Sequence, residues 1–417
     1  MDLAFKKSYK ILFFIFTFLV FAVLYCQATN PSWKSHLEID TWVWYQRIDF
    51  FRTHGKSFAG LEGNEILPAT LLFLFIPAVF SGLSKIDYGL YLKSALGLNL
   101  LILLFHVLLC KKQANFVKTL FFLLVLLLIG PIMLFRFDAA VTLLVLLSIW
   151  FFKKKNFALS GFSLGWAFAM KIFPIIFLPY FLLVLWFKPK NRLQIIPFLA
   201  FFTIPIILSA LVFLSLGSTL EQITEALNFH SLKYVSIESI PGSLLTAVYL
   251  FFNKKPLPLL GGYGLWGVKS KFVDTLGLQF FNYLWILPVG IFYLFLIFKR
   301  VFLKKLYLGV FFWTILLFLV FSKNLHPQYI FWFIAFFPFL KIKTKGWVDY
   351  LAMFFLLSTI ALLNQNIYPR LYTAFIENFY YRGQQHEIFY LQLLRNLSIV
   401  LLLIYSFRPI FLKKTIE

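Results

Sequence analysis

Long apolar runs recur along almost the whole chain, and short basic segments separate them. Of the 417 residues, 61% are hydrophobic and only 13% are charged, whereas soluble domains carry about 25% charged residues. Runs of this length can cross a bilayer only as helices, because lipid offers the backbone no hydrogen-bond partners. The runs are continuous rather than alternating, which argues against a transmembrane barrel. The sequence therefore predicts an all-α polytopic integral membrane protein with about 12 transmembrane helices.

One apolar run, residues 157–187, is too long for a single span. Lys153–Lys155 and Arg192 flank it, so we expect a hairpin or two broken halves with the tip at residues 171–174. Pro174 suits such a break because it removes a backbone donor. The expected spans are 11–27, 67–83, 88–110, 116–134, 137–152, 157–187, 195–216, 278–298, 302–321, 328–340, 347–364 and 391–407, with a weaker one at 243–252.

The net charge of +23 comes largely from the short segments between spans. Short basic loops are typical of the cytoplasmic side of a membrane, and this distribution argues against nucleic-acid binding. One conflict arises. If the amino terminus is cytoplasmic, Lys111 and Lys112 fall on the outer side, two spans after residues 28–66. Either the span 67–83 or 88–110 is broken or re-entrant, or these lysines break the rule.

The segments assigned to the non-cytoplasmic side hold most of the less ordinary polar residues. Polar groups gathered on one membrane face suggest a site there, whereas transporters more often place theirs near the midplane. These segments are residues 28–66, 135–138, 170–174, 217–242, 322–328 and 365–390.

Two carboxylates in the first of these segments stand out, because nearly every other strongly polar cluster is basic. Asp40 could act as a base or contact a substrate; otherwise it caps the helix that starts near Thr41. Glu38 could orient Asp40, bind a substrate or help to hold a metal ion, or it is a solvated charge. Residues 41–54 are expected to form an amphipathic helix that lies on the membrane.

Four stretches of the chain resemble, in order, the motifs of the GT-C glycosyltransferases. Residues 38–40 (Glu-Ile-Asp) match an acidic Asp-x-Asp motif, and residues 170–174 (Met-Lys-Ile-Phe-Pro) match a Phe-Lys-Ile-Tyr-Pro stretch. Residues 228–233 resemble a Phe-x-x-His-x-x-Arg stretch, and residues 321–332 resemble Phe-x-Lys-x-x-x-x-Gln-Tyr-x-x-Trp. The nearest likeness is to the first mannosyltransferases of glycosylphosphatidylinositol synthesis and to bacterial polyprenyl-phosphate-mannose-dependent enzymes. The chain departs from them in Glu38, which replaces the first Asp, and in a missing Tyr before Pro68.

The resemblance implies a catalytic module over residues 1–240 and a variable module over residues 241–417. It implies inverting transfer of a sugar, expected to be mannose, from a polyprenyl-phosphate donor to a lipid-linked or cell-envelope acceptor. The reaction would occur on the non-cytoplasmic face of a bacterial plasma membrane. Such chemistry needs a base for the acceptor hydroxyl and cations for the leaving phosphate. Asp40 is the expected base, with Glu38 beside it.

Seven further residues are candidate substrate contacts. Each has an ordinary alternative: Lys171 could snorkel to the headgroups, and the other side chains could belong to amphipathic loops or polar caps. The candidates are Glu65, Lys171, His230, Lys233, Lys323, His326 and Gln328.

Other classes of function remain open at this stage. A transporter or flippase of a lipid-linked glycan would explain the spans and the basic character, and a non-catalytic assembly subunit is a weaker third interpretation. Cys26 and Cys110 lack a pair spacing for zinc or redox chemistry, and no phosphate-binding glycine loop appears. No cofactor is certain, although the acidic pair is compatible with a divalent cation. The expected partners are the donor, the acceptor and membrane lipids.

Overall fold

The structure is a computed structural model that describes residues 3–54, 66–82, 87–262, 264–340 and 347–411. These residues form helices joined by short turns, apart from one two-stranded hairpin. The prediction of a helical membrane protein is therefore confirmed, although it missed the hairpin. Within the described residues, six helical stretches are long and apolar enough to cross a membrane: Ile11–Thr29, Tyr88–Gln113, Pro189–Ser215, Lys271–Phe298, Trp347–Arg370 and His386–Arg408.

The helices coincide with the expected spans to within a few residues at most ends. They are α1 (Leu3–Thr29), α2 (Pro31–Leu37), α3 (Ile39–His54), α4 (Pro68–Phe80), α5 (Tyr88–Gln113), α6 (Phe116–Ile129), α7 (Asp138–Lys153), α8 (Phe157–Met170), α9 (Leu178–Trp186), α10 (Ile195–Ser215), α11 (Leu220–Leu232), α12 (Ile240–Asn253), α13 (Lys271–Tyr283), α14 (Ile286–Phe298), α15 (Leu308–Phe321), α16 (Ile330–Ile334), α17 (Trp347–Gln365), α18 (Tyr372–Ala374) and α19 (His386–Phe411).

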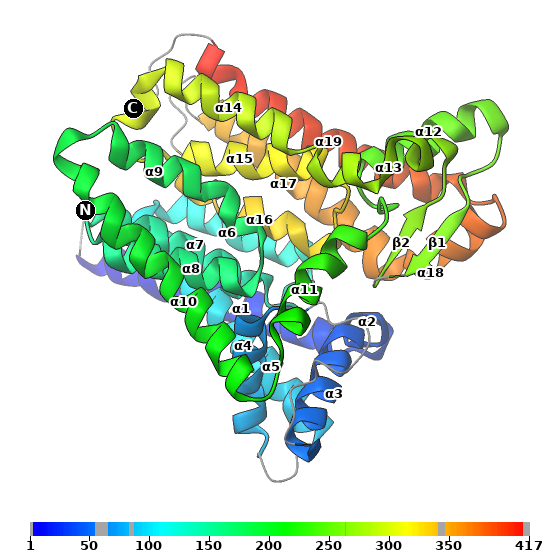
Figure 1. Ribbon diagram of the computed structural model, residues 1–417, viewed down its shortest axis with the longest axis horizontal. Helices are drawn as coiled ribbons and strands as arrows, with labels where there is room; N and C mark the ends of the chain where they lie inside the picture. The colour runs from blue at the N-terminus through cyan, green and yellow to red at the C-terminus, as the bar shows by residue number, and fades with distance from the viewer. Residues whose placement is uncertain (1–2, 55–65, 83–86, 263, 341–346, 412–417) are drawn as a thin grey trace.

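The longer helices lie side by side, with both chain ends at one end of the bundle and α12, α18 and the hairpin at the other (Figure 1). The long run at residues 157–187 is two helices, as expected. Lys171 is extended at the end of α8, and a tight turn from Phe173 to Phe177 leads into α9, with Pro174 in its first turn. The tip of this helical pair therefore lies at the end of the bundle opposite the basic loops at 153–155 and 188–192.

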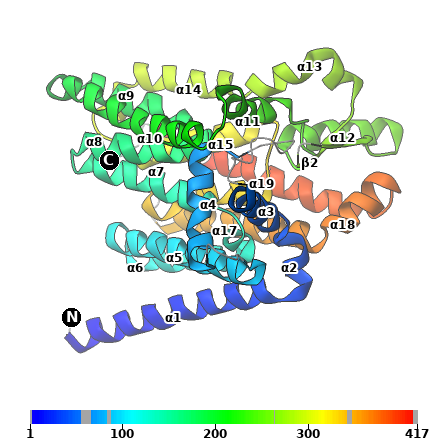
Figure 2. The same ribbon diagram turned by 60° about the horizontal axis from the view of Figure 1, so that its bottom comes forward.

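Helix α4 resolves the conflict over Lys111 and Lys112. Lys111 lies over the ring of Phe13, 4.1 Å from its centroid, and Lys112 lies 5.4 Å from the ring of Trp150. These contacts place the end of α5 beside the amino-terminal half of α1 and the end of α7; Figure 2 labels the three helices. Helix α4 has 13 residues, about 20 Å of helix against about 30 Å of hydrocarbon. Helix α4 is too short to carry the chain from one end of the bundle back to the other, whereas α5, with 26 residues, does so.

The tightest helix packing joins α8 to α10 through glycines. An ideal Cβ on Gly161 would lie 2.0 Å from the carbonyl oxygen of Phe198, and one on Gly165 would lie 2.1 Å from that of Phe202. Small residues four apart let helix backbones approach closely where lipid gives no hydrophobic driving force between helices. On the opposite side of α8, Ser160 exchanges hydrogen bonds with Ser148 of α7. Helix α8 is therefore locked between α7 and α10.

A small second core lies at the far end of the bundle, around the hairpin. Strand β1 (Leu259–Gly262) pairs antiparallel with β2 (Leu265–Val268). The hairpin also holds residues 235–237, because Ile237 donates to the carbonyl of Trp266 and Val268 donates to that of Val235. Ser236 donates in turn to the carbonyl of Lys323. These bonds connect the end of α11, the hairpin and the turn after α15.

Replacing Gly161 by alanine should destabilise the protein. The added methyl would overlap the Phe198 carbonyl, and overpacking of this kind typically costs about 1–3 kcal/mol. Thermal unfolding in detergent measures the loss. Gly97→Ala on α5 is the matched control, because its Cβ would meet nothing within 4 Å. Equal stability of the two variants would contradict this packing.

Cysteine reporters should show that α4 does not cross the membrane. With Cys26 and Cys110 replaced by alanine, exposed reporters at Lys112 and Lys154 should react with an impermeant thiol reagent from the same side. A reporter at Gln384 should react from the other side. Labelling of Lys112→Cys from the same side as Gln384→Cys would show that α4 crosses.

Candidate functional site

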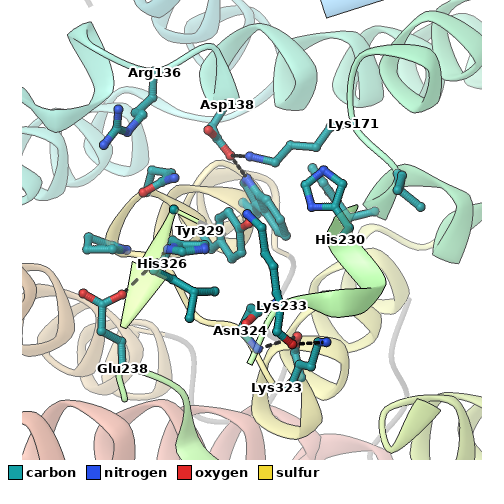
Figure 3. A pocket seen from close by; sticks show the side chains of 18 of the residues that line it. Arg136, Asp138, Lys171, His230, Lys233, Glu238, Lys323, Asn324, His326 and Tyr329 are labelled. Atoms are coloured by element: carbon teal, nitrogen blue, oxygen red, sulfur yellow. Dashed lines mark hydrogen bonds and ion pairs between the residues drawn. The ribbon is translucent and has the colours of Figure 1, made fainter. Parts of the chain in front are cut away.

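A cavity of about 740 Å³ lies where the turns at one end of the bundle converge. Each of the six segments that the sequence assigned to one membrane face contributes side chains to its wall. Figure 3 shows the polar side chains from several of these turns pointing toward one another. The members used below are Asp40, Arg136, Asp138, Lys171, His230, Lys233, Glu238, Lys323, His326, Gln328 and Trp332.

The innermost feature of the cavity is an ion pair between Lys171 and Asp138. The Lys171 ammonium lies 2.7 Å from the Asp138 carboxylate, whose side chain is 1% exposed, and Trp332 donates to the same oxygen at 2.6 Å. The ammonium also lies 4.7 Å from the ring centroid of Tyr329, within the range of a cation–π contact. Burial nevertheless lowers the pKa of Lys171, since it outweighs the opposing effect of Asp138.

Stacked aromatic rings hold this ion pair in place. Trp332 lies between Phe173 and Tyr329, with centroid separations of 3.7 Å and 4.0 Å and nearly parallel planes. Phe173 follows the break after α8, whereas Tyr329 lies in the turn before α16 and Trp332 lies on α16 itself. The stack therefore joins two turns that are far apart in the sequence. Asp138 compensates much of the charge of Lys171. This lysine should therefore attract a bound anion less strongly than its position in the sequence predicts.

Asp40 faces the cavity from the first turn of α3 and forms an ion pair with Arg136. The Asp40 side chain is 42% exposed, whereas that of Arg136 is 8% exposed. A buried guanidinium presents a fixed set of donors, so it orients the carboxylate while leaving one side of it open to the cavity. The expected base thus has its geometry set by a residue more than ninety positions away.

Cationic side chains from α11 and from the turn after α15 gather on another wall. Lys323 donates to the carbonyls of Ser231 (2.9 Å) and Lys233, which draws the end of α11 toward residue 323. Burial and the neighbouring charge of Lys233 lower the pKa of Lys323 to about 8. His230, in the last turn of α11, lines the same part of the cavity. The structure therefore brings together the candidate substrate contacts of two separate motifs.

A histidine and a buried carboxyl group form the remaining polar wall. His326 Nδ1 lies 3.8 Å from Glu238 Oε2, and their side chains are 14% and 4% exposed. Burial raises the pKa of Glu238 to about 7, although Arg395 and Arg136 oppose the shift. Burial and the cations around the cavity, Lys233 first among them, lower the pKa of His326 well below its ordinary value. This pair holds its proton on the carboxyl group rather than on the imidazole.

The structure does not bring every candidate to the cavity. Gln328 lines the wall, whereas Glu65 lies outside the described residues. Glu38 turns to Lys34, 3.5 Å away, and accepts a hydrogen bond from the hydroxyl of Tyr88 at 3.3 Å. It is absent from the described lining, although it is two residues from Asp40.

The acidic pair at positions 38 and 40 does not fit a divalent cation in this arrangement. Asp40 is engaged by Arg136, and Glu38 points to other partners. Among the described residues, no group of three His, Cys, Asp or Glu side chains could hold a metal ion. The chemistry of the cavity is therefore derived from its own side chains.

Sequence reasoning left four residues of this region out of the site. Arg136 and Asp138 lie at the start of the expected span 137–152, and Glu238 follows α11; all three are in segments that the sequence assigns to the non-cytoplasmic side. Arg395 lies inside an apolar run, and an intramembrane charge by itself indicates a functional or structural role. Its guanidinium is fully buried and bonds to the Asn364 side chain at 3.1 Å. Only the folded chain reveals which partners these residues meet.

Comparison with family models, curated proteins and solved structures finds no match for this chain. What the protein does must therefore be inferred from the cavity. The described residues of its wall include four Lys or Arg side chains and three carboxyl groups. Two of the carboxylates are paired with cations, and burial raises the pKa of the third, Glu238, to about 7. The cavity therefore has an excess of positive charge, which favours an anionic ligand such as a phosphate group.

Asp138→Asn should destabilise the protein by about 3 kcal/mol, because it leaves the Lys171 ammonium without its carboxylate. Combining it with Lys171→Gln should cost less than the sum of the two single changes. Denaturant unfolding in detergent measures both effects. Asp49→Asn is the control, since its pair with Arg52 is partly exposed and should contribute less than about 1 kcal/mol. Strict additivity at the buried pair would contradict this interpretation.

Proposed function

We propose that this protein is a membrane glycosyltransferase. It moves a sugar, mannose in the simplest case, from a polyprenyl-phosphate donor to a lipid-linked or cell-envelope acceptor. The observation that carries the proposal is the composition of one cavity. An accessible carboxylate, Asp40, shares it with the cations Lys233 and Lys323 and with His230. A base for an acceptor hydroxyl and positive charge for a leaving phosphate are the two requirements of this reaction.

The apolar part of the cavity wall supports a lipid-linked substrate. Phe281 and Tyr283 at the end of α13, Trp285 before α14 and Phe318 of α15 line it. Tyr283 is 61% exposed on the outside of the bundle. An apolar surface that continues from the phosphate-binding cations to the outside of the helices suits an isoprenoid chain attached to a phosphate.

The cavity residues divide the reaction between them. Asp40 takes the proton of the acceptor hydroxyl as its oxygen attacks the anomeric carbon from the side opposite the phosphate. Arg136 keeps the Asp40 carboxylate in position. Lys233, Lys323 and His230 stabilise the negative charge that develops on the departing phosphate. Attack from the opposite side gives inversion at the anomeric carbon.

The wider assignment follows the same proposal. It takes the helical fold to be a GT-C-like arrangement of about twelve spans, with residues 1–240 as the catalytic module and 241–417 as the variable module. The positive-inside rule places the basic loops in the cytoplasm. The cavity then opens on the non-cytoplasmic face of a bacterial plasma membrane. The rival interpretation, a flippase of a lipid-linked glycan, needs the anion-binding cavity but no base.

Asp40→Asn should lower sugar transfer at least about 100-fold, because an amide cannot accept the acceptor proton. The assay uses purified protein in lipid, radiolabelled polyprenyl-phosphate mannose and a membrane-lipid extract as acceptor. Asp49→Asn is the matched control, since it removes a carboxylate from the same helix without touching the cavity. Thermal unfolding of both variants separates lost chemistry from lost fold.

Two results would count against this assignment. Full transfer by Asp40→Asn would move the base to another residue. Movement of a lipid-linked glycan across vesicles by wild type and Asp40→Asn alike, with no transfer by either, would favour the flippase.

A further inference from the structure

The carboxyl group of Glu238 contacts a histidine, whereas the other two carboxyl groups in the described lining contact a lysine or an arginine. The residue is 3% exposed, yet it lines the cavity. His326 Nδ1 lies 3.8 Å from its carboxylate, and the pair is neutral when the proton is on Glu238. Asp40 and Asp138, by contrast, each contact a cation. Glu238 is therefore placed differently from the other two acids.

The main chain of Glu238 is held rigidly. Arg395 donates to its carbonyl at 2.6 Å, and its amide donates to the hydroxyl of Ser236 at 3.2 Å. Ser239, the next residue, caps the amino end of α12 through the amide of Gly242. A fully buried arginine on α19 thus fixes the backbone of the acid without neutralising its carboxyl group. This arrangement keeps the carboxyl group at one place in the cavity wall.

His326 lies between Glu238 and the cationic wall, as Figure 3 shows. An anion that binds to that wall lowers the local positive potential and so favours protonation of the pair. The titratable and charged groups that act on Glu238 or His326 are Arg395 on α19, Arg136 before α7, Lys171 after α8, His230 and Lys233 at the end of α11, and Tyr368, Tyr372 and Tyr380 between α17 and α19.

We propose that Glu238, with His326, is the acid that protonates the departing phosphate in the transfer reaction. This inference rests on the proposed function and assigns a second catalytic carboxyl group to it. A polyprenyl phosphate leaves as a monoester, whose second pKa is about 6 by analogy with phosphorylated side chains. An acid works best when its proton affinity is close to that of the group it serves. Glu238 meets this condition through its burial.

The protons and electrons of the step balance. The acceptor oxygen bonds to the anomeric carbon and gives its proton to Asp40. The bond between that carbon and the phosphate oxygen breaks, and its electron pair stays on the oxygen. The proton of Glu238 then moves to the phosphate, directly or through His326. The products are an ionised Glu238, a protonated Asp40 and a polyprenyl phosphate monoanion. Proton exchange with water then ionises Asp40 and protonates Glu238 again.

The pH dependence of ligand binding tests this role without any sugar transfer. The probe is a polyprenyl phosphate methyl ester, whose single negative charge does not titrate near neutral pH. Protonated Glu238 favours the anion. Wild-type affinity should therefore be highest below about pH 6 and fall about fourfold by about pH 7.5, as expected for a pKa of about 7. Lys323, with a pKa of about 8, adds a further fall at higher pH.

Glu238→Gln keeps the size of the side chain and the main-chain bonds but cannot titrate. Its affinity for the probe should stay constant within about twofold from about pH 6 to about pH 7.5, while the later fall due to Lys323 remains. Glu225→Gln on the exposed face of α11 should behave like wild type. Glu238→Asp should keep the pH dependence, which provides a test if the glutamine variant does not fold.

The outcomes separate this inference from the proposed function. Probe binding with the same pH dependence in wild type and Glu238→Gln would overturn the role of Glu238 and leave the phosphate site intact. No probe binding by wild type at any pH would overturn the proposed function together with this inference. In the transfer assay, Glu238→Gln should lower kcat about 100-fold with KM little changed, and unaltered kcat would also overturn the role.

Discussion

The buried pair of Lys171 and Asp138 is the interaction on which the rest of the site depends. Neither charge can be left alone in an apolar interior without a penalty of several kcal/mol. The break after α8 and the start of α7 must therefore meet. Trp332, on α16, donates to the same carboxylate. The start of α7, the break after α8 and α16 therefore meet at one carboxylate, and α3 and the end of α11 complete the cavity wall beside them.

The sequence predicted the helices well because the constraint that makes them is local. An apolar run of sufficient length has to be helical in lipid, and Pro174 marks the break in the longest run. Helix α4 was the exception. Its apolar run resembles a span, and the positions of Lys111 and Lys112 indicated only that one of the spans 67–83 and 88–110 is broken or that these lysines break the rule. The contacts of these lysines with Phe13 and Trp150 place the end of α5 beside α1 and α7.

The candidate site was predicted less completely, for a physical reason. The basic loops assigned six segments to one face, and side chains from all six line one cavity. Partners, however, are set by folding: Asp40 meets Arg136, and Glu38 turns away although it is two residues distant. The hairpin β1–β2, which holds residues 235–237, has no strong sequence signal. Arg395 did have a sequence signal, because a charged residue inside an apolar run needs a buried polar partner.

The central claim is that the cations of the cavity bind a phosphate group carried by a lipid. An experimental structure of the protein in lipid nanodiscs with bound polyprenyl phosphate tests it most directly. The account predicts phosphate oxygens within hydrogen-bond distance of Lys233, Lys323 and His230, with the isoprenoid chain leaving past α13 and α14. A phosphate bound outside the cavity, or at the membrane surface beside the basic loops, would contradict it.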